Sequence, residues 1–330
     1  METLIHLYIL LGILPPHLLF VQDKVSRGGR RTDCRGENEG EERSDEISRS
    51  VYSNKMQKHN HSQFTMKKIL LLFSLIICIA AKAQDKVLRI PYSADKSIYG
   101  VICEPSTGAK KHGIAIISHG FNGTHHFGRD YFKTLNNLGY AVYTFDFPCG
   151  SVNSQSDNNT MNMSVTDEKE ALKTIVKFFQ KQKNIDKRRI VLIGESQGGL
   201  VSALAASELK KQVSNLVLIY PALCIPDNWN ERYPRVEDIP EVSEIWGVKL
   251  GKKFMMDLRP MKPFETIGDY KGRVLIVHGT DDKVVPLDYS KRAVETYKNA
   301  TLKIIDKAGH GFNPEERVLS NQYVEEFLNP

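Results

Sequence analysis

Short apolar runs alternate with amphipathic stretches along the chain from Gln84 onward. Runs of this length, bounded by glycine, proline and charged residues, are typical of β-strands. Because strands and helices alternate, the pattern predicts an α/β protein with a largely parallel sheet covered by helices. Eight strands are expected, over residues 86–91, 99–104, 113–118, 141–146, 189–193, 213–220, 273–278 and 301–306.

The helices are predicted from apolar residues spaced three and four positions apart. Ser164 and Asp167 resemble a capping box at the start of one such stretch, which continues through Ala171, Ile175 and Phe179. Further helices are expected over residues 128–138, 287–298 and 314–328.

One segment interrupts the alternation. Residues 222–267, called the cap segment below, lie between two expected strands and are too long for an ordinary connection, which predicts a small cap. Its aromatic side chains either pack the cap onto the core or bind an aromatic part of a substrate, and the sequence favours neither role. Trp229, Tyr233 and Trp246 are therefore candidate substrate-binding residues.

The most informative motif follows the expected strand 189–193. It reads Gly-x-Ser-x-Gly, with Ser196 between Gly194 and Gly198. Glycines at these two positions let the backbone turn sharply from strand to helix without side-chain clashes, and this turn presents a serine as a nucleophile. The motif is short enough to arise by chance, so its interpretation depends on the rest of the chain.

Two later loops supply the partners that a nucleophilic serine needs. A serine hydroxyl is activated by a neighbouring base, usually a histidine that a carboxylate orients. Asp281 and Asp282 follow one expected strand, and His310 follows the next. The order serine, aspartate, histidine, each after a strand, predicts a serine hydrolase. At this stage both aspartates remain candidates for the acid.

Over residues 84–330 the chain resembles the α/β-hydrolase superfamily, and within it the small cinnamoyl and feruloyl esterases. The resemblance rests on His119-Gly120-Phe121, Phe145-Asp146-Phe147, the serine turn, His278-Gly279-Thr280-Asp281-Asp282 and Gly309-His310. It implies an α/β-hydrolase fold, in which helices flank a mostly parallel, eight-stranded sheet that carries a small cap insertion.

The same resemblance implies roles for individual residues. The catalytic triad would be Ser196, Asp282 and His310, with Asp281 as the second choice for the acid. The oxyanion hole would be formed by the backbone N–H groups of Phe121 and Gln197, which fits the usual position of such donors. Two departures weaken any transfer of substrate preference. Glu195 stands where the family often has histidine, and residues 148–151 replace a turn rich in glycine and histidine.

These features predict a carboxylic-ester hydrolase that needs neither a metal nor an organic cofactor. Small-molecule or polysaccharide-linked esters are the expected substrates, with hydroxycinnamoyl or acetyl esters of plant polysaccharide suggested by the resemblance. One alternative is a serine peptidase of the prolyl-oligopeptidase-like type that acts on short peptides. The other is a binding module on the same fold without catalysis. His125 and His126 have no third ligand at metal spacing, so a metal site is not expected.

The amino-terminal part predicts export. Lys67 and Lys68 precede an apolar segment and an Ala-x-Ala site, so residues 66–83 are interpreted as a signal peptide without a lasting membrane anchor. The mature protein is then expected to be periplasmic or secreted. Residues 1–65 are expected to be a poorly ordered extension or the product of a misassigned start codon.

Composition narrows the classes of partner. The net charge is +6 over 330 residues, and half of it lies before residue 84, so neither nucleic acid nor a membrane surface is an expected partner. Cys103, Cys149 and Cys224 remain after the predicted cleavage. Their odd number and their spacing indicate neither a disulfide framework nor a zinc site.

Overall fold

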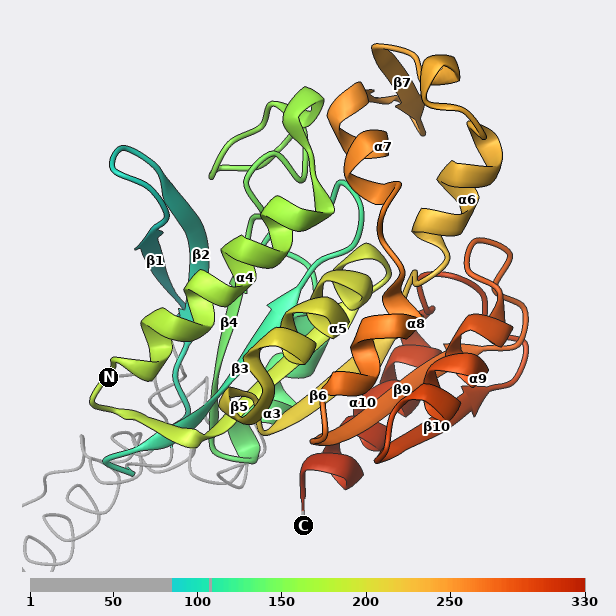
Figure 1. Ribbon diagram of the computed structural model, residues 1–330. Helices are drawn as coiled ribbons and strands as arrows, with labels where there is room; N and C mark the ends of the chain where they lie inside the picture. The colour runs from blue at the N-terminus through green and yellow to red at the C-terminus, as the bar shows by residue number, and fades with distance from the viewer. Residues whose placement is uncertain (1–84, 107–108, 330) are drawn as a thin grey trace, which may run out of the picture. The chain divides into compact units, whose positions relative to one another are not determined.

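The computed structural model describes residues 85–106 and 109–329 (Figure 1). The predicted signal peptide (66–83) and upstream extension (1–65) lie outside these residues and remain predictions. In the described ranges no helix is both long enough and apolar enough to span a bilayer.

An eight-stranded sheet forms the centre of the fold. Its strands are β1 (Lys86–Pro91), β2 (Ser97–Cys103), β3 (His112–Ser118), β4 (Tyr140–Phe145), β5 (Ile185–Glu195), β6 (Asn215–Ile219), β9 (Arg273–Gly279) and β10 (Ala300–Ile305). The order across the sheet is β1-β2-β4-β3-β5-β6-β9-β10. Only β2 runs against its neighbours, β1 and β4; the other pairs are parallel. This confirms the predicted mostly parallel sheet.

The side chains of the central strands alternate between two apolar clusters. In β3, Ile114 and Ile116 belong to one cluster and Ala115 and Ile117 to the other, and all four are buried. Helices α4 (Val165–Gln180), α5 (Gln197–Leu209) and α9 (Leu287–Thr296) cover the first face, whereas α3 (Phe132–Asn137) and α10 (Pro314–Leu328) cover the second (Figure 1). Burial on both faces explains why these strands are continuous apolar runs.

The element boundaries differ from the sequence prediction in a few places. β5 begins four residues earlier than residue 189, because buried Ile185 already pairs with His112 of β3, whereas the polar residues 186–189 that follow interrupt the apolar run in the sequence. The expected helix 128–138 is divided into a 3-10 turn (Arg129–Tyr131) and α3. Ser164 caps α4 by accepting a hydrogen bond from Asp167 N at 3.2 Å, but the Asp167 carboxylate pairs with Lys253. The capping box is therefore only half formed there.

The cap segment contains α6 (Ile225–Arg232), the hairpin β7 (Val242–Ile245) and β8 (Val248–Gly251), α7 (Lys252–Leu258) and α8 (Pro263–Thr266). Figure 1 shows α6, β7 and α7 beyond the ends of the strands. Asp257 of α7 fixes this segment to the start of α4, where its carboxylate accepts hydrogen bonds from Ser164 Oγ and Thr166 N at 3.0 and 2.9 Å. These contacts hold the cap segment next to the carboxyl-terminal ends of the central strands, where β5 ends (Figure 1).

A matched pair of valines tests the packing of the first apolar cluster. Val176 of α4 is fully buried, whereas Val318 of α10 is 59% exposed. Val176→Ala removes two buried methyl groups and is expected to lower the free energy of unfolding by about 1.5–3 kcal/mol. Val318→Ala makes the same chemical change on an exposed helix position and should change it by less than about 0.5 kcal/mol. Urea denaturation measures both, and equal effects would contradict the packing described.

Candidate active site

Ser196 lies at the turn between β5 and α5. Its backbone adopts φ 52° and ψ −121°, a conformation that L-residues rarely occupy. Ser196 N donates to Ile219 O at 3.0 Å, and Ala222 N donates to Ser196 O at 2.9 Å. At Gly198 a Cβ atom would collide with the carbonyl oxygens of Ser118 and His119. The glycine is thus required because the helix start and the β3 loop touch there.

The structure brings Ser196, His310 and Asp282 into one hydrogen-bonded chain. His310 Nε2 lies 2.9 Å from Ser196 Oγ, and His310 Nδ1 lies 2.8 Å from Asp282 Oδ2. Because a carboxylate accepts, Nδ1 carries the proton and Nε2 is left to accept from the serine. His310 keeps 19% of its side chain exposed, whereas the Asp282 side chain is fully buried. This geometry suits proton transfer from the serine to the histidine.

Asp282 is held by more than His310. Its Oδ1 accepts hydrogen bonds from Val284 N and Val285 N, both at 2.8 Å, and His278 Nε2 lies 3.3 Å from Oδ2. Burial alone would raise the pKa of Asp282, but the hydrogen bonds from His278, His310 and Val285 outweigh burial and lower the pKa well below its usual value. Asp282 therefore stays ionised and orients the imidazole.

Asp281 points elsewhere. Its side chain is exposed, and within the described residues its carboxylate has no hydrogen-bond or ion-pair partner. The two neighbouring aspartates are thus distinguished by the turn that follows β9, which buries the second one only.

Phe121 and Gln197 line the same cavity as Ser196. Gln197 N is at the amino terminus of α5, and Gly120 is close enough to Ser196 that an added Cβ would lie 3.2 Å from the serine Cβ. In the part of the chain that the structure describes, neither the Phe121 N–H nor the Gln197 N–H donates a hydrogen bond. Two free donors beside a serine can stabilise an oxyanion.

His119 fixes the loop that carries Phe121. Its Nε2 accepts a hydrogen bond from Phe147 N at 3.1 Å, and its Nδ1 donates to Gly120 O at 2.7 Å. Burial lowers the pKa of His119 to about 4, so the ring is neutral at physiological pH. His119 therefore joins the loops after β3 and β4.

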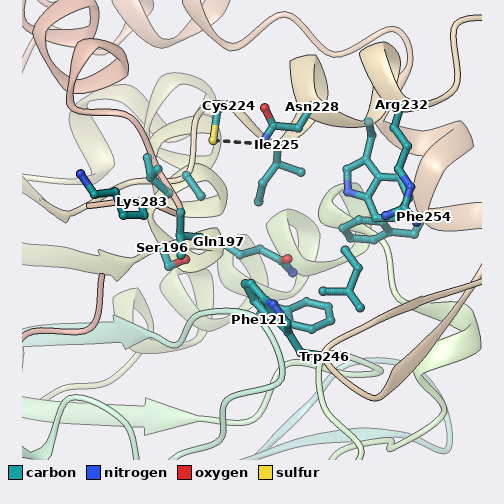
Figure 2. Close-up of a pocket in the computed structure, with 15 residues that line it drawn as sticks. Phe121, Ser196, Gln197, Cys224, Ile225, Asn228, Arg232, Trp246, Phe254 and Lys283 are labelled. Carbon is teal, nitrogen blue, oxygen red and sulfur yellow. Dashed lines mark hydrogen bonds between the residues drawn. The ribbon is translucent and has the colours of Figure 1, made fainter. Parts of the chain in front are cut away.

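A cavity of about 460 Å³ opens above Ser196 (Figure 2). Phe121, Trp229, Trp246 and Phe254 form its aromatic walls. Trp246 lies at the tip of the β7–β8 hairpin, is 73% exposed, and contacts Phe121 edge to face with 5.8 Å between ring centroids. Tyr233 does not line the cavity: its ring stacks on Trp229, and its hydroxyl lies 3.1 Å from Ser243 Oγ.

The chain resembles known hydrolases. It matches the family model described as serine aminopeptidase, S33, over residues 109–261. It is similar to Est1E from Butyrivibrio proteoclasticus, with 25% sequence identity and a TM-score of 0.65 over 73% of this chain and 97% of that one. A structure of Est1E with ferulic acid bound aligns over the same fractions of both chains, with the same sequence identity and a TM-score of 0.67. The chain has the fold of the α/β-hydrolase superfamily.

A third solved structure has the same fold. The hydrolase aligns with a monoacylglycerol lipase from Paleococcus ferrophilus at 18% identity and a TM-score of 0.53, over 70% of this chain and 98% of that one. No curated protein matches the chain. The predicted likeness to the α/β-hydrolases and to feruloyl esterases is confirmed.

Two buried carboxyl groups of the hydrolase were not predicted as part of the site. Glu168 accepts hydrogen bonds from Gln197 Nε2 at both oxygens, at 3.0 and 2.9 Å, and so fixes the residue after Ser196. Glu195 accepts from Tyr220 Oη at 2.6 Å, and the Tyr220 ring lies 4.7 Å from the His310 ring. The sequence does offer one sign of Glu168, because it is an acidic residue on the otherwise apolar face of α4. Nothing in the sequence marks Tyr220.

The other polar candidates have ordinary partners. His125 Nδ1 lies 2.8 Å from Asp146 Oδ1. Among the described residues there is no group of three or more His, Cys, Asp or Glu side chains arranged to hold a metal ion. Cys103, Cys149 and Cys224 are all free thiols.

Glu168 is expected to make the stability of the hydrolase pH-dependent. Burial raises the pKa of Glu168 to about 8, above the value of about 4.3 in an unfolded chain. Between these values the folded state holds a proton that the unfolded state has lost, so stability decreases as pH rises through this window. Glu168→Gln removes this proton uptake, and its melting temperature should fall less between pH 5 and pH 8.

The exposed Glu244→Gln is the matched control and should retain the pH dependence of the unmodified protein. An unchanged slope in Glu168→Gln would contradict the assignment. Calorimetry across the pH range measures both variants.

Proposed function

We propose that the protein hydrolyses carboxylic esters through a covalent acyl-enzyme on Ser196. The observation that carries the proposal is the hydrogen-bonded chain Ser196–His310–Asp282, with distances of 2.9 and 2.8 Å, beside two free backbone donors at the base of a cavity. The similarity to esterase structures supports the same reaction class.

In the first half of the reaction, Ser196 Oγ attacks the ester carbonyl carbon while His310 Nε2 takes the hydroxyl proton. The N–H groups of Phe121 and Gln197 stabilise the charge that develops on the carbonyl oxygen, each worth about 10²–10³ in rate. When the tetrahedral intermediate collapses, the bond to the alcohol breaks and His310 returns the proton to the leaving oxygen.

In the second half, water replaces the alcohol. His310 takes a proton from the attacking water, and the acyl bond to Ser196 breaks as the proton passes to Oγ. Asp282 keeps the imidazole in the required tautomer and stabilises its protonated form. The products are a free acid and the regenerated serine, so the cycle needs no cofactor.

The aromatic walls support an aromatic acyl group as the substrate. A cinnamoyl group is flat and apolar, and Phe121, Trp229 and Phe254 offer matching surface. Ferulic acid is the ligand bound to Est1E in one of the similar structures. We therefore favour hydroxycinnamoyl esters, including those attached to plant polysaccharide, and acetyl esters as smaller members of the class. Trp229 and Trp246 are the proposed contacts.

The family model matched by the chain describes serine aminopeptidases, which makes a peptidase the second candidate. An aminopeptidase must bind the ammonium group at the start of its substrate, and a carboxylate is the natural partner for that charge. No aspartate or glutamate is among the residues that line this cavity, and the charged residues that do are Arg232 and Lys283. The charge of the cavity thus favours esters over peptides with a free amino terminus.

Ser196→Ala separates the proposed reaction from pure binding. Residues 84–330 should hydrolyse methyl ferulate and a short-chain p-nitrophenyl ester, and the variant should lose about 10⁴-fold or more in kcat with both. Hydrolysis of the p-nitrophenyl ester alone would keep the esterase and remove the hydroxycinnamoyl assignment. If the folded protein hydrolyses neither ester, the proposal is wrong, and the serine peptidase and the binding module without catalysis become the favoured alternatives.

The adjacent aspartates provide a matched test of the acid. Asp282→Asn changes the partner of His310 Nδ1 and should lower kcat by about 10⁴-fold, because the imidazole is then held in the wrong tautomer. Asp281→Asn makes the same change on an exposed side chain and should leave kcat within about twofold of the unmodified enzyme. The reverse order of effects would reject Asp282 as the acid.

A further inference from the structure

The charged side chains of the cavity have one sign. Arg232 and Lys283 are the charged residues among those that line it. Figure 2 shows Lys283 near Ser196 and Arg232 on the other side of the cavity, next to Phe254. Arg232 therefore presents a positive charge on the side of the cavity away from the serine that is proposed to cleave the ester.

Arg232 is held in place without using its hydrogen-bond donors. Its guanidinium lies over the ring of Trp229, 5.3 Å from the centroid, and 5.5 Å from that of Tyr233. Within the described residues Arg232 makes no hydrogen bond from its side chain and no ion pair. The stacking on two aromatic rings orients the fork while its five N–H groups remain available.

Neighbouring arginines of the cap segment are occupied. Arg235 pairs with Asp238 through two hydrogen bonds of 2.9 and 2.6 Å. Arg259 donates to the carbonyl oxygens of Tyr233 and Pro234 at 2.7 and 2.9 Å. The donors of both guanidinium groups are therefore used within the cap segment. Arg232 has no such structural partner, and it is the one of these three that lines the cavity.

A planar guanidinium with free donors fits a carboxylate, which accepts two parallel N–H···O bonds. The rings of Trp229 and Phe254 touch edge to face, with 5.8 Å between their centroids, and form one continuous wall of the cavity. An aromatic acyl group whose carbonyl carbon lies at Ser196 would extend along this wall, and its far end would approach Arg232, which lies across the cavity from Ser196 (Figure 2). The positions of the nucleophile, the aromatic walls and the free fork thus define a substrate with an apolar middle and an anionic end.

We propose that Arg232 is a specificity-determining residue that selects esters whose aromatic acyl group ends in an anion, best a carboxylate. The assignment rests on the proposed function, because it takes Ser196 as the point where the ester is cleaved. It also defines a binding subsite that the triad itself does not require.

Two probes of the same shape test the assignment: methyl 4-carboxycinnamate, which carries a negative charge at its far end, and methyl 4-carbamoylcinnamate, which does not. The unmodified enzyme should prefer the charged ester in kcat/KM by about tenfold or more, the usual effect of charge-assisted hydrogen bonds. Arg232→Gln should bring the ratio close to one, and Arg232→Lys should retain part of it.

Arg235→Gln is the matched control, because it removes an arginine of the cap segment that does not line the cavity, and the ratio should not change. An unchanged ratio in Arg232→Gln would overturn the proposal. So would an equal loss of preference in Lys283→Gln, because the preference would then reflect the overall charge of the cavity.

Methyl cinnamate and p-nitrophenyl acetate separate this result from a failure of the proposed function. If neither is hydrolysed in a manner that depends on Ser196, the esterase proposal is wrong and the Arg232 proposal falls with it. If both are hydrolysed while methyl 4-carboxycinnamate and methyl 4-carbamoylcinnamate give equal kcat/KM, the esterase proposal stands and only the Arg232 subsite is rejected.

Discussion

The arrangement of the site depends on the close contact between the start of α5 and the loop after β3. Gly198 allows this contact, since a side chain there would strike the carbonyl oxygens of Ser118 and His119. The contact brings the loop that carries Phe121 against the helix start that carries Gln197, so that both residues line the same cavity as Ser196. Ser196 adopts its positive φ in the same turn, and its backbone hydrogen bonds with Ile219 and Ala222 hold that conformation.

Around this contact, buried polar side chains hold the groups that face the cavity. His119 fixes the loop of Phe121, Glu168 fixes Gln197, and Asp282 fixes His310. Each support is itself buried, so each depends on hydrogen bonds that water does not replace. The elements that face the substrate differ from these supports, because the aromatic walls from the cap segment make few polar contacts and Trp246 is largely exposed.

The sequence predicts the sheet well because its strands are buried on both faces and are continuous apolar runs. It also predicts which segments carry Ser196, His310 and the aspartates, since each follows such a run. It does not separate Asp281 from Asp282 by physical argument, because their orientation depends on how the turn packs against His278. For the same reason it does not distinguish Tyr233, behind Trp229, from Trp246 at the cavity, and it gives no sign that Tyr220 would reach His310.

The three members of the hydrogen-bonded chain come from loops after β5, β9 and β10, and β10 is the last strand of the sheet, paired with β9 only. Ser196 and His310 are 114 residues apart. Ser196 can therefore reach its base only after the carboxyl-terminal strand has joined the edge of the sheet. During synthesis the turn that carries Ser196 would form before His310 could reach it. Folding itself therefore delays the appearance of a reactive nucleophile until β10 has joined the sheet.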